Sequence, residues 1–396
     1  MTMREAFLQT LRAALRDRGV AVFFVLAIPA YSFFYPLPYA TEAVRNVPVV
    51  IVDLDASALS REVAARLSAV AAIRIAGRAS SVAEAGDALA AGSIAGIVVV
   101  PENFQRDTLR GTATAVTAFG SGAYPVQDKA VLGSVGLVVE SVALEHAAAR
   151  LLRQGAPPAA VLQAARAGPA FVDQPLYNLG RGYGSYVVTA VSILIVQQIM
   201  LIGIAALVGT WLERREGTLF GAPTLPLGAF AGTVAGFALF ALFALLYFFG
   251  FVYWLHDYPR GGNLPGALAF AALTAATLAC LGIALGAWFA DRERALQVLL
   301  ATSIPFLFLC GVVFPRESIP APLDALAALI PTTPGIVGFV KLNQMGAAWS
   351  EIRPEFVNMS ALLALYGAAA WWAVNMRRRD PIGDKVKDSP TPSDEP

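Results

Sequence analysis

The segment Trp211-Leu212-Glu213-Arg214-Arg215-Glu216-Gly217-Thr218 is a cluster of charge between two long apolar stretches. Residues 187–209 and 217–256 contain no Asp, Glu, Lys or Arg. About 20 helical residues, rising roughly 1.5 Å each, cross the hydrocarbon core of a bilayer, so each stretch is long enough for a transmembrane helix. Because charge is unfavourable inside lipid, the cluster must lie at a membrane face, and its two arginines indicate the cytoplasmic one. In a generic membrane protein, such a cluster is a solvated turn that only orients the helices.

Composition places the chain among integral membrane proteins with a soluble portion. Of the 396 residues, 57% are hydrophobic and 14% charged, against about 25% charged in a soluble domain. The formal net charge of +1 supplies no basic field, so no nucleic-acid partner is expected. The two cysteines, Cys280 and Cys310, lie in apolar stretches, which excludes a disulfide framework and disfavours a thiolate metal site. We expect no metal to be bound.

The N-terminal residues predict an amphipathic helix followed by a first span. Residues 1–19 combine an apolar and a basic side, which is typical of a helix on the inner membrane surface. Residues 20–40 are uncharged and predict transmembrane helix 1, ended by Pro36 and Pro38. A cleaved signal peptide is the alternative, disfavoured because the apolar stretch is long and no clear Ala-x-Ala site follows it. The apolar side of 1–19 comprises Phe7, Leu8, Leu11 and Leu15, and the basic side Arg4, Arg12, Arg16 and Arg18.

Residues 41–182 change in character and predict an inserted α/β domain with a helical return to the membrane. Short β-branched stretches, such as Val47–Val52 and Ile94–Val100, alternate with helical ones. Ser81 and Glu84 have the spacing of a capping box, which predicts the start of a helix. This alternation of strands and helices is the basis for the domain assignment.

Two features of this region have competing interpretations. Asp53 and Asp55 follow a predicted strand and could ligate a cation, but a helix-capping turn is favoured. The uncharged stretch Ala130–Val139 could belong to a seventh transmembrane helix. It is half a bilayer long and closely flanked by charges, so helices of the domain at 126–154 and 157–167 are predicted instead.

The C-terminal half, residues 183–376, predicts a membrane domain with five further spans. Arginine and lysine are concentrated in alternate loops, so the positive-inside rule places both termini in the cytoplasm and residues 41–182 outside it. Residues 377–396 predict a disordered cytoplasmic tail. The fold class is therefore an α-helical polytopic membrane protein with six transmembrane helices and an inserted α/β extracytoplasmic domain. The five further spans are expected at 183–210, 225–255, 265–290, 295–314 and 356–376.

Motifs for nucleotide binding and enzymatic chemistry are absent from the sequence. It holds no G-x-x-x-x-G-K-[ST] phosphate loop, and no H-E-x-x-H or G-x-S-x-G in a suitable context. No uninterrupted span has a central acid, which argues against a proton-driven pump. We therefore expect no enzymatic activity of this chain and an energy source supplied by another protein.

Three stretches, in register with this topology, resemble the permease subunits of type-2 ABC exporters, in the subgroup with a large extracytoplasmic domain after the first helix. Glu213–Leu219 is similar to the family's E-R-E-x-G-T element between the second and third spans, with an additional arginine. Pro305–Pro320, with the sequence PFLFLCGVVFPRESIP, resembles the family's fifth span and outer loop. Asn46–Arg61 resembles the opening of the external domain. The likeness covers nearly the whole chain.

This resemblance implies a site for each end of the membrane domain. A coupling helix would contact an ATPase, with Gly217 allowing the bend and Thr218 capping the helix. The outer loop 315–355 would be re-entrant and close the exit pathway. The coupling residues would be Glu213, Arg214, Arg215, Glu216, Gly217 and Thr218, with further contacts from Asp291, Arg292, Glu293 and Arg294. The outer gate would comprise Phe314, Pro315, Arg316, Glu317 and Pro320.

The expected function is that of a permease subunit of an ATP-driven exporter in the bacterial cytoplasmic (inner) membrane. The resemblance implies a dimer with an identical or closely related permease and separate cytoplasmic ATPase subunits, which would bind ATP and Mg²⁺. A periplasmic adaptor is a further expected partner of the external domain, and the lipid bilayer surrounds the spans. The alternative is a membrane-anchored sensor with a ligand-binding α/β domain. A sensor would usually need a cytoplasmic output domain, and the longest inner segment, at about 20 residues, is too short to form one. An intramembrane enzyme is a third hypothesis, for which no catalytic set is visible.

Overall fold

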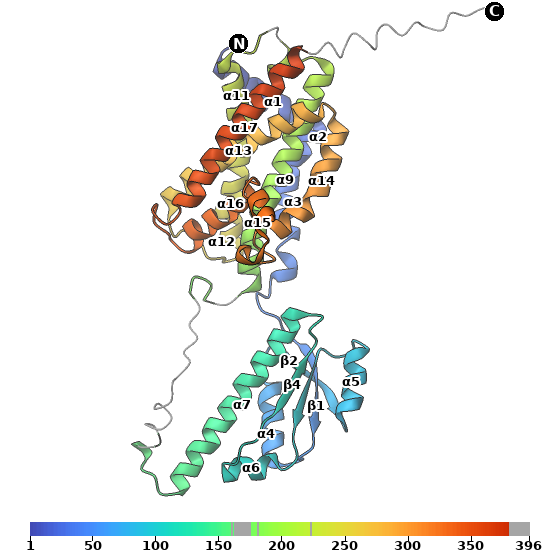
Figure 1. Ribbon diagram of the computed structural model, residues 1–396, viewed down its shortest axis with the longest axis vertical. Coiled ribbons are helices and arrows are strands. Elements are labelled where there is room, and N and C mark those ends of the chain that lie inside the picture. Colours follow the sequence, from blue (N-terminus) through green and yellow to red (C-terminus); the bar gives the residue numbers. More distant parts are fainter. Residues whose placement is uncertain (160, 162–175, 180–181, 222–223, 380–396) are drawn as a thin grey trace, which may run out of the picture. The chain divides into compact units, whose positions relative to one another are not determined.

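The computed structural model describes residues 1–159, 161, 176–179, 182–221 and 224–379. It divides into two units, which we call the membrane unit (Met1–Ala40 with Leu176–Pro396) and the inserted unit (Thr41–Pro175). The described residues are mostly helical with a small mixed sheet, which confirms the predicted fold class at that level (Figure 1). Most of the predicted helix at 157–167 and nearly all of the predicted tail at 377–396 lie outside the described residues.

A four-stranded sheet in the order β2-β1-β3-β4 forms the centre of the inserted unit. β1 pairs in parallel with β2 and with β3, while β3 and β4 are antiparallel. The β-branched residues of β1 are buried on both faces, which explains its interior position. The strands are β1 Val47–Asp53, β2 Ile73–Ala79, β3 Gly96–Val100 and β4 Thr117–Gly120.

Helices cover both faces of this sheet, and Figure 1 shows α5 and α7 on opposite sides of it. One face packs Val49 and Ile51 of β1 against residues of α4, α6 and α7. The other packs Val50 and Val52 against Ala85 of α5. Two small apolar layers therefore sandwich the sheet. The helices are α4 Ala58–Ser68, α5 Val82–Ala90, α6 Phe104–Arg110 and α7 Pro125–Arg153.

The helix α7 is long and apolar enough to cross a membrane, yet its contacts lie within the inserted unit. Its valines at i, i+4, i+7 and i+11 are buried against the sheet. Glu145 forms an ion pair with Arg66 of α4, with an Oε2–Nη2 distance of 2.5 Å. These contacts favour a domain helix over the seventh-span interpretation. The buried valines are Val131, Val135, Val138 and Val142.

The turn after β1 uses its acidic side chains for hydrogen bonding. Asp53 Oδ1 accepts the amides of Asp55 and Ala56 at 3.2 and 2.9 Å, and Oδ2 accepts the hydroxyl of Ser60 at 2.8 Å. Asp55 Oδ2 accepts the amide of Gln105 at 3.0 Å. The arrangement supports the capping-turn interpretation of these two acids.

Six helices within the described ranges are long and apolar enough to span a membrane, as many as the sequence predicts, but the set differs. It includes α7 and does not include α14, Arg292–Leu309, whose first turn carries three charges. The helix α14 also ends at Leu309, before the predicted boundary of 314. The five candidates of the membrane unit are Arg18–Tyr39, Tyr183–Arg214, Leu227–Leu255, Leu264–Phe289 and Arg353–Arg379.

The helix α9, Tyr183–Arg214, is central in the membrane unit and is buried at every position from Val187 to Leu212. An uncharged helix that is apolar on all sides favours such a position. It contacts α11, α13, α14 and α16. Other elements are α1 Met3–Arg16, α2 Arg18–Ala21, η1 Val22–Ala27, α3 Ile28–Phe34, η2 Leu37–Tyr39, α10 Gly217–Phe220, α11 Leu227–Leu246, η3 Tyr247–Val252, α12 Tyr253–Leu255, α13 Leu264–Phe289 and α17 Arg353–Arg379.

The helix α1 packs on α11 through small residues, and not through its predicted apolar side. Ala6, Thr10 and Ala14 are buried. A Cβ added to Gly232 of α11 would lie 2.2 Å from the Met3 carbonyl oxygen, so the two backbones are in close contact. Half of the predicted membrane-facing side remains exposed within the unit: Leu8 is 37% and Leu15 54% exposed, whereas Phe7 and Leu11 are half-buried.

Two helices after α14 form a bent pair. The segments Ala321–Ala327 (α15) and Thr332–Gln344 meet at 80°. The second segment comprises α16 Thr332–Phe339 and η5 Val340–Gln344, and the short η4 Arg316–Ser318 precedes α15. The bend fits the re-entrant loop expected at 315–355, because neither piece is long enough to cross a bilayer alone.

Candidate functional site

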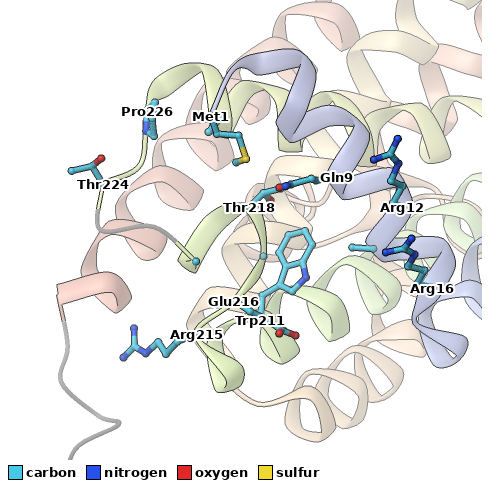
Figure 2. Close-up of a pocket in the computed structure, with 14 residues that line it drawn as sticks. Met1, Gln9, Arg12, Arg16, Trp211, Arg215, Glu216, Thr218, Thr224 and Pro226 are labelled. Atoms are coloured by element: carbon cyan, nitrogen blue, oxygen red, sulfur yellow. The ribbon is translucent and has the colours of Figure 1, made fainter.

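A cleft of about 800 Å³ lies where α9 joins α10. Its walls are α1, the α9–α10 turn and the start of α11. Figure 2 shows Arg12 and Arg16 extending from α1 on one side and Arg215 on the other. With Glu216 as the one lining carboxylate, the cleft carries an excess of positive charge. The sequence did not indicate that α1 contributes to this site.

The geometry of the α9–α10 turn is fixed by its backbone. Arg215 adopts the left-handed conformation with φ 53°, and the Glu216 amide donates to the Trp211 carbonyl at 3.0 Å, which closes the helix end. Gly217 has φ 78°, and a Cβ there would lie 2.6 Å from the Trp211 ring. Trp211 is 3% exposed and packs on Phe237 with ring centroids 6.0 Å apart. Only glycine fits at position 217, for both conformational and steric reasons.

The short helix α10 is attached to two other helices. The hydroxyl oxygens of Thr218 and Thr233 of α11 lie 2.9 Å apart. The Arg378 guanidinium of α17 donates to the Leu219 carbonyl. The family resemblance assigned Thr218 to a cap, but α10 has no side-chain cap bond and the Thr218 hydroxyl meets α11 instead.

Glu213, Arg214, Arg215 and Glu216 are all exposed, and of these Arg214 and Glu216 pair with each other. Their side chains are 66% and 53% exposed, and Nη1 of Arg214 lies 3.5 Å from Oε1 of Glu216. An exposed pair of this kind contributes roughly 0–1 kcal/mol, so exchanging it for contacts with another protein carries little penalty. Arg215 differs, because its Nη1 donates to the Arg377 carbonyl at 2.7 Å.

The second charged loop joins the first through Glu213. Its Oε1 accepts the backbone amide of Arg292 at 3.2 Å. Asp291 caps α14 by accepting the amides of Glu293 and Arg294 at 2.7 and 3.4 Å. Glu293 and Arg294 are exposed, so only part of this loop is presented to solvent. Glu213, expected to contact a partner, is exposed and also accepts the bond from the Arg292 amide within the chain.

Asp17, which the sequence analysis did not select, completes this junction. Its carboxylate accepts two hydrogen bonds from the Arg292 guanidinium. Burial alone would raise the pKa of Asp17, but the bonds from Arg292 and the Val20 amide hold it below its usual value. The available indication was an acid beside Arg18, just before an uncharged stretch begins.

The comparison with protein families gives one match: the model described as "ABC-2 family transporter protein" covers residues 19–372. The chain belongs to this family. A search of curated proteins found no match. The family assignment confirms the type-2 ABC permease resemblance, and the match spans both units of the chain. ABC-2 membrane proteins are transport subunits that work with ATPase subunits.

In this ABC-2 protein, the predicted gate residues lie between α14 and α15 and do not line the cleft. Arg316 pairs with Asp324 of α15, with Nε and Nη2 at 2.8 and 2.5 Å from Oδ1. Pro315 and Pro320 precede η4 and α15, and Phe314 is 52% exposed. The salt bridge fixes the loop to the helix that follows it. Glu317 is exposed in the same loop.

A metal centre finds no support in the described part of this ABC-2 protein, where no group of three or more His, Cys, Asp or Glu residues could hold an ion. The thiols of Cys280 and Cys310 are buried and unpaired with each other.

Proposed function

We propose that this chain is the permease subunit of an ABC exporter and that an ATPase docks at the cleft beside α10. The observation that carries this proposal is the α9–α10 turn, which holds Arg214 and Glu216 exposed on a rigid backbone. The charge of Arg12 and Arg16 favours an ATPase surface with acidic groups, because complementary charge steers docking. ATP and Mg²⁺ would be held by that partner.

The bonds around the turn supply a route for coupling. A displacement of α10 would act on α11 through Thr218 and Thr233, and on α17 through Arg378. The bond of Glu213 to Arg292 links the same turn to α14. An ATPase that binds one conformation more tightly would thereby shift the permease between its states.

The permease would work as a dimer in the bacterial inner membrane, with the cleft in the cytoplasm and the inserted unit outside. The distribution of arginines supports this orientation, since both loops of the junction and the end of α17 are rich in them. In this arrangement α14 is the fifth span, for which its packing along α9 is the support. The inserted unit would contact a periplasmic adaptor or the second permease.

The test is copurification of this chain with ABC ATPase subunits of the same organism. Replacing Arg214 and Glu216 with alanine should leave the fold intact and reduce binding or coupled ATP hydrolysis about tenfold or more, since charge-assisted contacts contribute roughly 1.5–3 kcal/mol each. The matched control replaces Asp257, an exposed turn residue after α12, and Arg353, the exposed first residue of α17, with alanine. Unchanged coupling in the Arg214/Glu216 variant would reduce the turn to an orienting loop.

A further inference from the structure

Two adjacent glutamines in the middle of α9 differ in their surroundings. Gln198 donates from Nε2 to the Leu299 carbonyl at 3.0 Å and to the Ser303 hydroxyl at 2.8 Å, both on α14. Gln197 is 1% exposed, and neither its Nε2 nor its Oε1 has a hydrogen-bond partner among the residues that the structure describes. Buried amides nearly always have partners, so an orphaned one calls for an explanation.

The helix α16 runs antiparallel to α9 and reaches the level of Gln197. At the end of η5, which continues α16, Gln344 Nε2 lies 3.4 Å from the carbonyl oxygen of Ser185. Further along, a Cβ on Gly335 would lie 3.3 Å from Cγ2 of Ile193. Thr332 lies one helical turn before Gly335 on α16, and Gln197 lies one turn after Ile193 on α9. Each is therefore on the same helix face as the residue that makes the contact.

The first residues of α16 are also orphaned polar groups. The hydroxyls of Thr332 and Thr333 have no partner within the described ranges, and the two residues are 1% and 0% exposed. Both stand directly after the 80° break that separates α16 from α15. The amide of Thr333 donates to the Ile330 carbonyl at 2.9 Å and Pro334 has no amide proton, so the side-chain hydroxyls are the polar groups without partners here. Three buried polar side chains thus lie at about one level of the membrane unit.

We propose that Gln197, Thr332 and Thr333 form a polar site inside the membrane unit that binds an uncharged hydrogen-bonding group, a hydroxyl or an amide, of the transported molecule. The amide of Gln197 offers donors and an acceptor, and each threonine hydroxyl offers both. Neither α16 nor α9 from Tyr183 to Leu212 contains Asp, Glu, Lys or Arg. A charged group would be left without a counter-charge, which is why the ligand class is uncharged.

The site is closed in this state, so α16 must move to admit a ligand. The break before Thr332 allows such a motion, because α16 is not continuous with a full span. This inference rests on the proposed function in one respect: that the bound ligand is the molecule that the protein transports. The site itself lies on α9 and α16 and uses none of the residues assigned to ATPase docking.

The first test measures entry of a small polar molecule into the site. The Gln197→Cys variant, in a background with Cys280→Ala and Cys310→Ala, is treated with the uncharged reagent 2-hydroxyethyl methanethiosulfonate in the assembled complex, with and without ATP. The control is Met200→Cys, a fully buried apolar position on the same helix. We expect modification at position 197 at least tenfold faster than at position 200, and much slower modification by the anionic 2-sulfonatoethyl reagent. Equal rates at both positions in every nucleotide state, or equal rates with both reagents, would overturn the proposal.

The second test uses the two glutamines as a matched pair. Gln197→Met should leave the thermal unfolding midpoint unchanged or higher, because it removes buried polar atoms without partners. Gln198→Met should lower the midpoint, because it removes the bonds to α14. A midpoint lowered equally by both would show that Gln197 has a structural role and would contradict the site. Copurification of the ATPase should be as efficient with Gln197→Met as with the unaltered chain. Failure of the unaltered chain to copurify would count against the proposed function and not against this site.

Discussion

Arg292 and Asp17 form a two-bond salt bridge, with Nη1–Oδ2 at 2.9 Å and Nη2–Oδ1 at 3.2 Å. The amide of Arg292 also donates to Glu213 at the end of α9. The backbones are close here, since a Cβ on Gly209 would lie 3.1 Å from the Arg292 nitrogen. One residue therefore joins the α1–α2 junction, the end of α9 and the start of α14.

Replacing either partner should destabilise the membrane unit. Because the Arg292 and Asp17 side chains are 36% and 20% exposed, solvent screens the pair, and we expect Asp17→Asn or Arg292→Gln to lower the unfolding free energy by about 1 kcal/mol. Thermal unfolding of the purified protein measures this, with the double variant closing a cycle. Strictly additive losses in the double variant would show that the two side chains do not interact.

The contact of α1 with α11 should depend on one glycine more than on its neighbour. A Cβ on Gly232 meets the Met3 carbonyl oxygen at 2.2 Å, whereas on Gly228 the nearest atom, the Met3 nitrogen, lies at 3.6 Å. Gly232→Ala should therefore destabilise the protein by roughly 1–3 kcal/mol through overpacking. Gly228→Ala should be neutral or stabilising by up to about 1 kcal/mol, because alanine favours helices. Proteolytic release of α1 and the unfolding midpoint are the measurements, and identical behaviour of the two variants would refute the packing argument.

The location of the inserted unit is open to cysteine labelling in intact cells. In the cysteine-free background, Ser93→Cys should react with an impermeant maleimide, because the residue is exposed and the unit is expected outside the cytoplasm. Arg379→Cys, at the exposed end of α17, should react only after the membrane is permeabilised. Protection of position 93 in intact cells would place the inserted unit in the cytoplasm and contradict the proposed topology.

The inserted unit should lose one of its contacts in acid. The hydrogen bond from Arg66 holds the pKa of Glu145 below its usual value, despite an opposing effect of desolvation. Since the folded pKa is the lower one, the stabilisation is complete above the ordinary value of about 4.3 and disappears as the pH falls through the folded value. Hydrogen exchange of α7 should therefore be faster in Glu145→Gln than in wild type at pH 7, and this difference should shrink below pH 4. Glu140→Gln, an exposed residue of the same helix, is the control, and a difference that persists in acid would exclude the ion pair as its cause.

The sequence was sufficient for the class of protein, for five of the six predicted spans and for the α/β character of the inserted unit. Hydrophobicity and charge are properties of each residue, so the uncharged stretches 187–209 and 217–256 predict membrane helices without knowledge of the fold. Local rules also favoured the capping turn at Asp53, because its partners lie within a few residues. The family resemblance rested on short motifs of the same local kind.

Only the tertiary structure decided which charged and polar side chains contact one another. Glu213 and Arg214 are neighbours of opposite charge in the sequence, yet Glu213 bonds to Arg292 of the next charged loop and Arg214 pairs with Glu216 of its own turn. Gln197 and Gln198 are the same residue type at adjacent positions. Gln198 is hydrogen-bonded to α14, whereas the side chain of Gln197 has no partner among the described residues. The physical reason is that each contact depends on which helix face meets which neighbour, and successive residues on a helix point about 100° apart. Asp17 and Arg292 are 275 positions apart in the sequence and form their salt bridge for the same reason. No local sequence pattern predicts a contact between residues so far apart.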